Sequence, residues 1–132
     1  MEKIFKKFFG KKILIAEDYM INQEVIQEIL KLMGFAVIDL AENGIEALEQ
    51  YNENDYDVIL MDIQMPEKDG YEAAKEIRKR EEGSAKHTII IALTANALIE
   101  DKERCLAAGM DAYISKPIEV KKLADILDQY ID

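Results

Sequence analysis

The stretch "DVILMDIQMPEKDG", residues 57–70, contains a run of aliphatic residues that ends in a single carboxylate, Asp62. A continuous apolar run of this length is typical of a buried strand in a parallel sheet. A Met-Pro pair and an acidic turn with glycine follow, and Asp69 is expected to cap a helix. The segment therefore predicts a buried strand that delivers an acid to its carboxyl end.

The rest of the chain repeats this alternation of apolar runs and helical periodicity. Strands are predicted at 12–17, 35–41, 57–62, 88–94 and 111–115, and helices at 21–33, from 44, from 70, at 97–108 and at 120–130. Such alternation indicates an α/β fold, a parallel sheet with helices on both faces. The three continuous runs suit the middle of the sheet, so we expect a flavodoxin-like, doubly wound, three-layer sandwich with strand order 2-1-3-4-5.

Composition narrows the class of protein. The chain has 132 residues, 49% of them hydrophobic, which suits one domain with a real core. No apolar run reaches the ~18 residues that a membrane span needs. The net charge of −10 argues against general nucleic-acid binding, which uses a basic surface. The lone cysteine, Cys105, suits a reducing cytoplasm, and we interpret it as a small buried hydrophobe.

The first residues differ from the rest. Residues 1–12 carry a charge of +4, whereas the remaining residues carry −14. We predict a basic and apolar extension at 1–11 and one domain at 12–132. Residues 1–10 either dock on a membrane or a partner, or form a short extension that packs loosely on the domain, and we expect the second.

Carboxylates follow two strands that the predicted order makes neighbours. Glu17 and Asp18 end the strand at 12–17, and Asp62 ends the strand at 57–62. Adjacent parallel strands lie ~4.8 Å apart, so three acids crowd one rim. Two like charges ~4 Å apart repel by roughly 4 kcal/mol at an effective dielectric near 20. A divalent cation with oxygen ligands, most simply Mg²⁺, is the expected counterion.

The two other strand ends at this rim carry complementary groups. Thr94 supplies a hydroxyl, and Lys116, held by Pro117, supplies an ammonium. An acid trio, a hydroxyl and a lysine form a phosphoryl site that needs no phosphate-binding loop. The metal and Lys116 neutralise phosphate oxygens, Thr94 donates a hydrogen bond, and one carboxylate acts as nucleophile.

With these strand-end residues, the sequence resembles the receiver domain of two-component response regulators. The motifs that carry the resemblance span most of the chain: "ILIAEDYMINQEV", "DVILMDIQMPEKDGYEA", "IIALTANAL" and "GMDAYISKPI". "DIQMPEKDG", "LTANA" and "GMDAYISKP" look most like receivers of hybrid sensor kinases and their single-domain relatives. A free-standing protein, which Met1 favours, and a piece of a larger kinase both remain open.

The resemblance implies a role for each strand-end residue. Asp62 matches the phosphoacceptor, and Glu17 and Asp18 match the acid pair that holds Mg²⁺. Gln64 matches the position that offers a backbone carbonyl to the metal. Thr94 matches the switch hydroxyl.

Two further positions match residues near the phosphoryl group. Lys116 matches the phosphate-binding lysine, followed by the family's cis-proline at Pro117. Tyr113 matches the aromatic whose rotamer follows the threonine. One departure is Tyr19, which replaces a frequent asparagine beside the pocket.

The implied activity is transfer of a phosphoryl group from the phosphohistidine of a histidine kinase or phosphotransfer protein to Asp62. The added charge then changes which partner binds the face built from the fourth helix, fifth strand and fifth helix. Most members are signalling proteins rather than metabolic enzymes. The resemblance also implies that the domain assists its own phosphorylation and dephosphorylation.

Two other function classes stay open, and a third, a phosphatase, is weakened by the sequence. A degenerate receiver that only binds a partner is disfavoured by the intact strand-end set. A flavodoxin-like mononucleotide binder is disfavoured because "EDYMIN" lacks the Gly/Ser/Thr-rich composition of a phosphate cradle. A phosphatase with an aspartate nucleophile would place a second acid where Gln64 stands.

His87, the one histidine, is interpreted as a loop residue without the partners of a zinc site.

Overall fold

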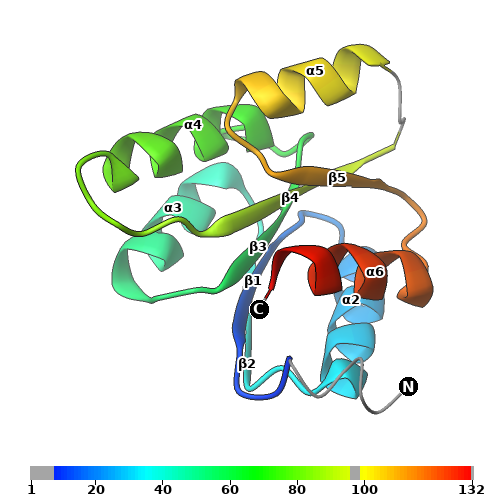
Figure 1. The fold of residues 1–132 in the computed structure, drawn as a ribbon. Coiled ribbons are helices and arrows are strands. Elements are labelled where there is room, and N and C mark those ends of the chain that lie inside the picture. The colour runs from blue at the N-terminus through cyan, green and yellow to red at the C-terminus, as the bar shows by residue number, and fades with distance from the viewer. Residues whose placement is uncertain (1–7, 96–98, 132) are drawn as a thin grey trace.

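The structure is a computed structural model that describes residues 8–95 and 99–131 (Figure 1). Strands and helices alternate along these residues. Their bounds are β1 (Lys12–Ala16), α2 (Met20–Met33), β2 (Val37–Ala41), α3 (Gly44–Glu53), β3 (Val58–Asp62), α4 (Gly70–Glu81), β4 (Ile89–Thr94), α5 (Ile99–Ala107), β5 (Ala112–Ser115) and α6 (Val120–Tyr130). The predicted elements are therefore present, and every strand after β1 starts one or two residues later than predicted.

The five strands form one parallel sheet in the order β2-β1-β3-β4-β5, which confirms the predicted topology. β3 is buried along its whole length, and β1 and β4 are buried except at their first residues. The edge strands β2 and β5 are mostly half-buried. Continuous apolar runs thus mark central strands here, because both of their faces are covered.

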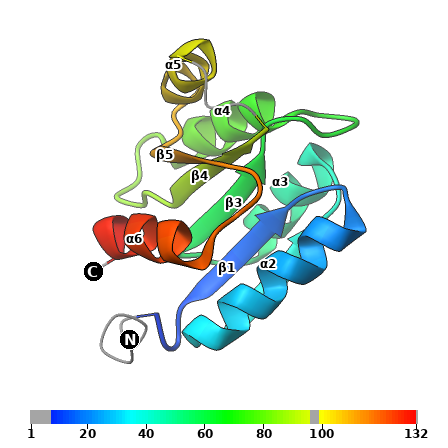
Figure 2. The same cartoon turned by 90° about the vertical axis from the view of Figure 1, so that its right-hand side faces the viewer.

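Alternate residues of each central strand enter different cores. Leu14, Ile59 and Ile90 pack with α3, α4 and α5 on one face. Ile13 and Leu60 pack with α2 and α6 on the other face. Figures 1 and 2 show the resulting three layers, with α2 and α6 together on one side of the sheet.

Local chemistry sets the helix ends. α2 stops at Gly34, whose φ of 94° lies in the left-handed region that glycine adopts readily. Asn43 and Asp69 cap α3 and α4, and their side chains accept hydrogen bonds from the backbone N–H groups of Glu46 and Glu72. The predicted start of the helix at 97–108 lies outside the described residues, which resume at Ile99.

One residue of the predicted extension belongs to the core. Phe8 is fully buried, and its ring stacks on Phe35 at a centroid distance of 5.7 Å. Phe9, its neighbour, is 59% exposed. The expected loose packing is therefore wrong at Phe8. Residues 1–7 of the extension lie outside the described residues.

A polar network closes the edge of the sheet where the strands begin. Arg78 of α4 donates to the carbonyl oxygens of Gly109 and Thr88 at 2.7 and 2.8 Å. Its guanidinium also pairs with Glu81 at 2.7 Å and Asp111 at 2.8 Å. Arg78 thus ties α4 to the segments that enter β4 and β5.

The predictions for His87 and Cys105 are also confirmed. His87 lies in the loop before β4, and its Nε2 is 2.8 Å from Oδ1 of Asp111. Cys105 is a buried free thiol. Among the described residues, no helix is long and apolar enough to cross a bilayer.

Candidate functional site

Three carboxylates meet at the edge of the sheet where the parallel strands end. Ala16 of β1 is paired with Met61 of β3, so the residues after Ala16 stand beside Asp62. One oxygen from each of Glu17, Asp18 and Asp62 lies within 4.8 Å of the others. Glu17 and Asp62 are buried, whereas Asp18 is exposed. We call this edge, with these three acids, the acidic rim.

An ammonium enters the rim from the end of β5. Nζ of Lys116 lies 2.7 Å from Oδ2 of Asp62 and 2.9 Å from Oε1 of Glu17. The backbone N–H of Lys116 donates to the carbonyl of Thr94 at 2.8 Å, which fixes the loop after β5 against β4. The Lys116-Pro117 peptide bond is cis. The predicted convergence of Lys116 on Asp62 is thus present, although the two residues lie far apart in sequence.

The charges at the rim shift one another's pKa values. Burial raises the pKa of Asp62 to about 6, and the neighbouring Glu17 adds to the rise while Lys116 opposes it. Burial alone would raise the pKa of Glu17, but hydrogen bonds with Asp62 and Lys116 outweigh it and lower that pKa. Burial alone would lower the pKa of Lys116, but its bonds to Asp62 and Glu17 raise it. The single positive charge of Lys116 therefore neutralises only part of the negative charge of Glu17 and Asp62.

The other predicted residues surround this pair. Thr94, the last residue of β4, is 1% exposed. The backbone N–H of Gln64 donates to Oδ1 of Asp62 at 2.9 Å, while the Gln64 side chain is exposed. Tyr113 is half-buried on β5, where it is paired with Ala92 of β4. The structure gathers these residues at and beside the rim, and their roles stay predictions.

Sequence reasoning missed the groups that hold Glu17. Nδ2 of Asn22 donates to its Oε1 at 2.9 Å, and the Tyr19 backbone N–H donates to its Oε2 at 3.3 Å. The side-chain amide of Gln23 donates to its backbone carbonyl. The local signal is Asn22 at the third position of a helix whose N-cap, Tyr19, makes no side-chain capping hydrogen bond.

The donor set fits a hard divalent cation. Three carboxylate oxygens converge from two strand ends, and Asp18 leaves one side of the cluster open to solvent. Oxygen ligands with an open side are what Mg²⁺ needs, since it retains several waters. The rim thus combines an acid cluster suited to a metal ion with an ammonium that contacts two of the same carboxylates. This is the set of groups that phosphoryl transfer uses.

This combination of fold and rim defines a class of α/β domain that carries an aspartate at the switch point of its sheet. The family described as the response regulator receiver domain matches residues 13–128. The chain belongs to this family, and the resemblance seen in the sequence is confirmed.

Curated relatives are histidine kinases. The chain is 42% identical over 130 residues to hybrid signal transduction histidine kinase B of Dictyostelium discoideum, covering 92% of this chain and 6% of the relative. It is 39% identical over 144 residues to histidine kinase 5 of Arabidopsis thaliana, covering 91% of this chain and 16% of the relative. The chain thus spans only a small part of the length of these relatives.

Solved receiver structures are similar over nearly the whole fold. One is the receiver domain of a Pseudomonas aeruginosa sensor histidine kinase with magnesium in its active-site cleft (43% identity, TM-score 0.82, 92% of this chain and 98% of that chain). Another is the receiver of a Saccharomyces cerevisiae response regulator, crystallised with a histidine phosphotransfer protein (34% identity, TM-score 0.85, 94% of this chain and 90% of that chain).

Proposed function

We propose that this chain is a phosphoacceptor receiver domain of a two-component phosphorelay. Its donor is the phosphohistidine of a histidine kinase or of a histidine phosphotransfer protein, and its acceptor is Asp62. The observation that carries the proposal is the 2.7 Å contact of the Lys116 ammonium with Asp62, inside a cluster of three carboxylates. The similar yeast receiver, which was crystallised with a phosphotransfer protein, supports the choice of donor.

The chemistry follows from the groups at the rim. A carboxylate oxygen of Asp62 forms a bond to phosphorus while the bond from phosphorus to the imidazole nitrogen breaks, and the imidazole leaves with the bonding pair. Lys116 moves its ammonium from Asp62 and Glu17 to an oxygen of the phosphoryl group. Thr94, buried at the end of the adjacent strand, donates its hydroxyl to another oxygen.

Glu17, Asp18 and Asp62, with the backbone carbonyl of Gln64, are the groups that we propose to hold Mg²⁺. When bound, the ion neutralises charge that develops on the phosphoryl oxygens. The magnesium in the similar Pseudomonas aeruginosa receiver supports this choice. The chain itself keeps the buried carboxylates of Glu17 and Asp62 close together. Lys116 neutralises only part of their negative charge, so the ion has a role to fill.

We predict that Mg²⁺ raises the melting temperature, and more so at pH 7.5 than at pH 5. Burial raises the pKa of Asp62 to about 6, so below this pH a proton occupies the carboxyl that the ion needs. The stabilisation is therefore present above about pH 6 and fades as the pH falls. At ~100 times the dissociation constant it amounts to roughly 2.7 kcal/mol. Thermal denaturation over a magnesium series at both pH values measures it.

Potassium chloride at matched ionic strength is the control for that experiment, because it screens the rim without coordinating it. An equal rise of the melting temperature in both salts at pH 7.5 would contradict the metal site.

The family consists of signalling domains rather than classical enzymes. We propose in addition that the rim assists both the phosphorylation of Asp62 and the later hydrolysis of the acyl phosphate. Lys116 and Thr94 stabilise charge on the phosphoryl oxygens in either direction. The contribution is a positioned set of groups, since the donor protein or water supplies the other reactant.

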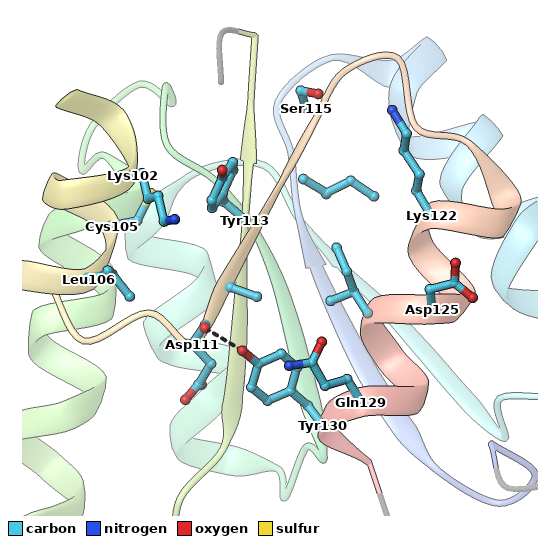
Figure 3. Close-up of a pocket in the computed structure, with 13 residues that line it drawn as sticks. Lys102, Cys105, Leu106, Asp111, Tyr113, Ser115, Lys122, Asp125, Gln129 and Tyr130 are labelled. Atoms are coloured by element: carbon cyan, nitrogen blue, oxygen red, sulfur yellow. Dashed lines mark hydrogen bonds between the residues drawn. The ribbon is translucent and has the colours of Figure 1, made fainter. Parts of the chain in front are cut away.

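The switch that we propose runs from Thr94 to Tyr113 and then to the face formed by α5, β5 and α6. Thr94 moves toward the phosphoryl group, and Tyr113 follows on the adjacent strand. Figure 3 shows Tyr113 on β5, turned toward α5 beside Lys102 and Cys105. A change in the position of its ring therefore changes the surface next to α5.

That surface contains a groove that suits a downstream protein. The groove has a volume of about 570 Å³ and lies between α5 and α6 above β5. Its lining includes the apolar residues Ile114 and Ile126. It also includes the charged side chains of Lys102, Lys122 and Asp125 (Figure 3). A groove lined by both apolar and charged side chains is typical of a site for a protein segment.

We propose that residues 12–132 form the receiver domain, and that residues 8–11 of the extension at 1–11 pack on it through Phe8. We further propose a cytoplasmic location, which the buried free thiol of Cys105 supports.

A truncation that lacks residues 1–7 tests the role of the extension. We expect unchanged phosphoryl labelling and unchanged magnesium response, because all groups of the rim lie in the retained part. We also expect that the full chain does not co-sediment with anionic vesicles. Sedimentation of the full chain but not of the truncation would instead assign residues 1–7 to membrane docking.

A further inference from the structure

The carboxylate of Glu17 is held by neutral donors as well as by Lys116. The Glu17 side chain is almost completely buried. Its Oε1 accepts a hydrogen bond from Nδ2 of Asn22 at 2.9 Å and lies 2.9 Å from Nζ of Lys116. Its Oε2 accepts the backbone N–H of Tyr19 at 3.3 Å. Both oxygens of this rim acid are therefore directed by groups of α2 and its N-cap.

The first turn of α2 is arranged around Glu17. In a common capping arrangement, the third helical residue returns its side chain to the N–H of the N-cap. Here the N-cap Tyr19 and the third residue Asn22 both donate to Glu17 instead. The positive end of the helix dipole favours the same carboxylate. Glu17 therefore accepts hydrogen bonds from the N-cap backbone N–H and from a side chain of the first turn of this helix.

The two donors to Oε1 of Glu17 differ in how far they can move. Lys116 bridges Glu17 and Asp62, and under the proposed function its ammonium moves to a phosphoryl oxygen. Asn22 is a short side chain on a regular helical turn, and its partner lies five residues before it. When Lys116 leaves, the Asn22 amide keeps Oε1 hydrogen-bonded and keeps the carboxylate facing Asp18 and Asp62.

We propose that Asn22 is a positioning residue for the metal site. It holds Glu17 in the orientation in which the three acids converge, and it allows Lys116 to exchange Glu17 for the phosphoryl group. This inference rests on the proposed function, because it assigns Asn22 to the same rim. Groups that orient a metal ligand in this way change metal affinity by roughly 10- to 100-fold when they are removed.

The test measures metal affinity rather than phosphorylation. We expect Asn22→Ala to raise the dissociation constant for Mg²⁺ by roughly tenfold. The magnesium dependence of the melting temperature measures this change, and the free-ion electron paramagnetic resonance signal of Mn²⁺ provides a second measurement. Gln27→Ala, a similar truncation further along α2, is the matched control and should leave the affinity unchanged.

A second background separates positioning from a general effect on the helix. Glu17→Asp shortens the acid by one methylene and withdraws its carboxylate from the Asn22 amide. In this background, Asn22→Ala should change the dissociation constant by less than about twofold, so the two substitutions are strongly non-additive, as expected for residues in contact. A merely structural role would lower the metal-free melting temperature and weaken binding equally in both backgrounds.

Two results would overturn the role of Asn22 while leaving the proposed function intact. One is an Asn22→Ala variant with the metal affinity of Gln27→Ala. The other is an equal loss of affinity on Asn22→Ala in the wild-type chain and in the chain that carries Glu17→Asp. Absence of metal binding by the unaltered chain would overturn the metal site itself, and the role of Asn22 with it.

Discussion

Asp62→Asn is expected to abolish phosphoryl labelling of this chain. The substitution keeps the shape of the side chain but replaces a carboxylate oxygen by an amide that does not attack phosphorus. The rim also loses a negative charge, so the variant should fold at least as stably as the wild type in the absence of Mg²⁺. Intact-mass measurement after incubation with acetyl phosphate and Mg²⁺ shows whether one phosphoryl group is added.

Asp69→Asn is the matched control for this experiment. It lies on the loop after β3 and caps α4, and asparagine caps helices about as well as aspartate. The control should be labelled to the same extent as the wild type. Normal labelling of Asp62→Asn would contradict the acceptor assignment, and loss of labelling in both variants would point to the loop rather than to the acceptor.

Phe8→Ala is expected to destabilise the fold by roughly 3–5 kcal/mol. The side chain is fully buried and stacks on Phe35, within the same core that contains residues of α2 and α6. The substitution removes a whole ring and leaves a cavity that the surrounding side chains fill only in part. Urea denaturation measured by circular dichroism gives the loss of unfolding free energy directly.

Phe9→Ala is the control that separates the effect of burial from the effect of losing a phenylalanine. Phe9 is the next residue but is 59% exposed, so its truncation should have a much smaller effect than that of Phe8. Equal losses of stability for the two variants would contradict the inclusion of Phe8 in the core.

The sheet and its rim were predictable because strong periodic signals specify them. The aliphatic runs that end at Glu17, Asp62 and Thr94 are uninterrupted, and helices separate them. Parallel strands connected in this way place all their carboxyl ends at one edge, so the sequence positions of the acids determine their meeting place. Asp69 and Gly34 were predictable for a similar reason, since each matches a local backbone requirement.

Contacts that depend on one side chain were not predictable in the same way. Phe8 stands in a lysine-rich segment, and nothing in its neighbours distinguishes it from the exposed Phe9. Arg78 lies in the run "RKRE" and looks like its solvent-exposed neighbours, yet it joins α4 to the entrances of β4 and β5. These roles depend on tertiary distances that periodicity does not encode.

The two ends of the described chain lie at the same edge of the molecule, and this edge is a useful place to attach a label. Phe8 precedes β1, and Ile131 follows α6, which returns from the rim. Both residues are buried in the same core. Each β1 residue advances by ~3.3 Å, so a five-residue strand separates this edge from the acids by about 16 Å. A fluorophore or surface tether attached beyond either residue would therefore leave the acceptor aspartate facing free solution.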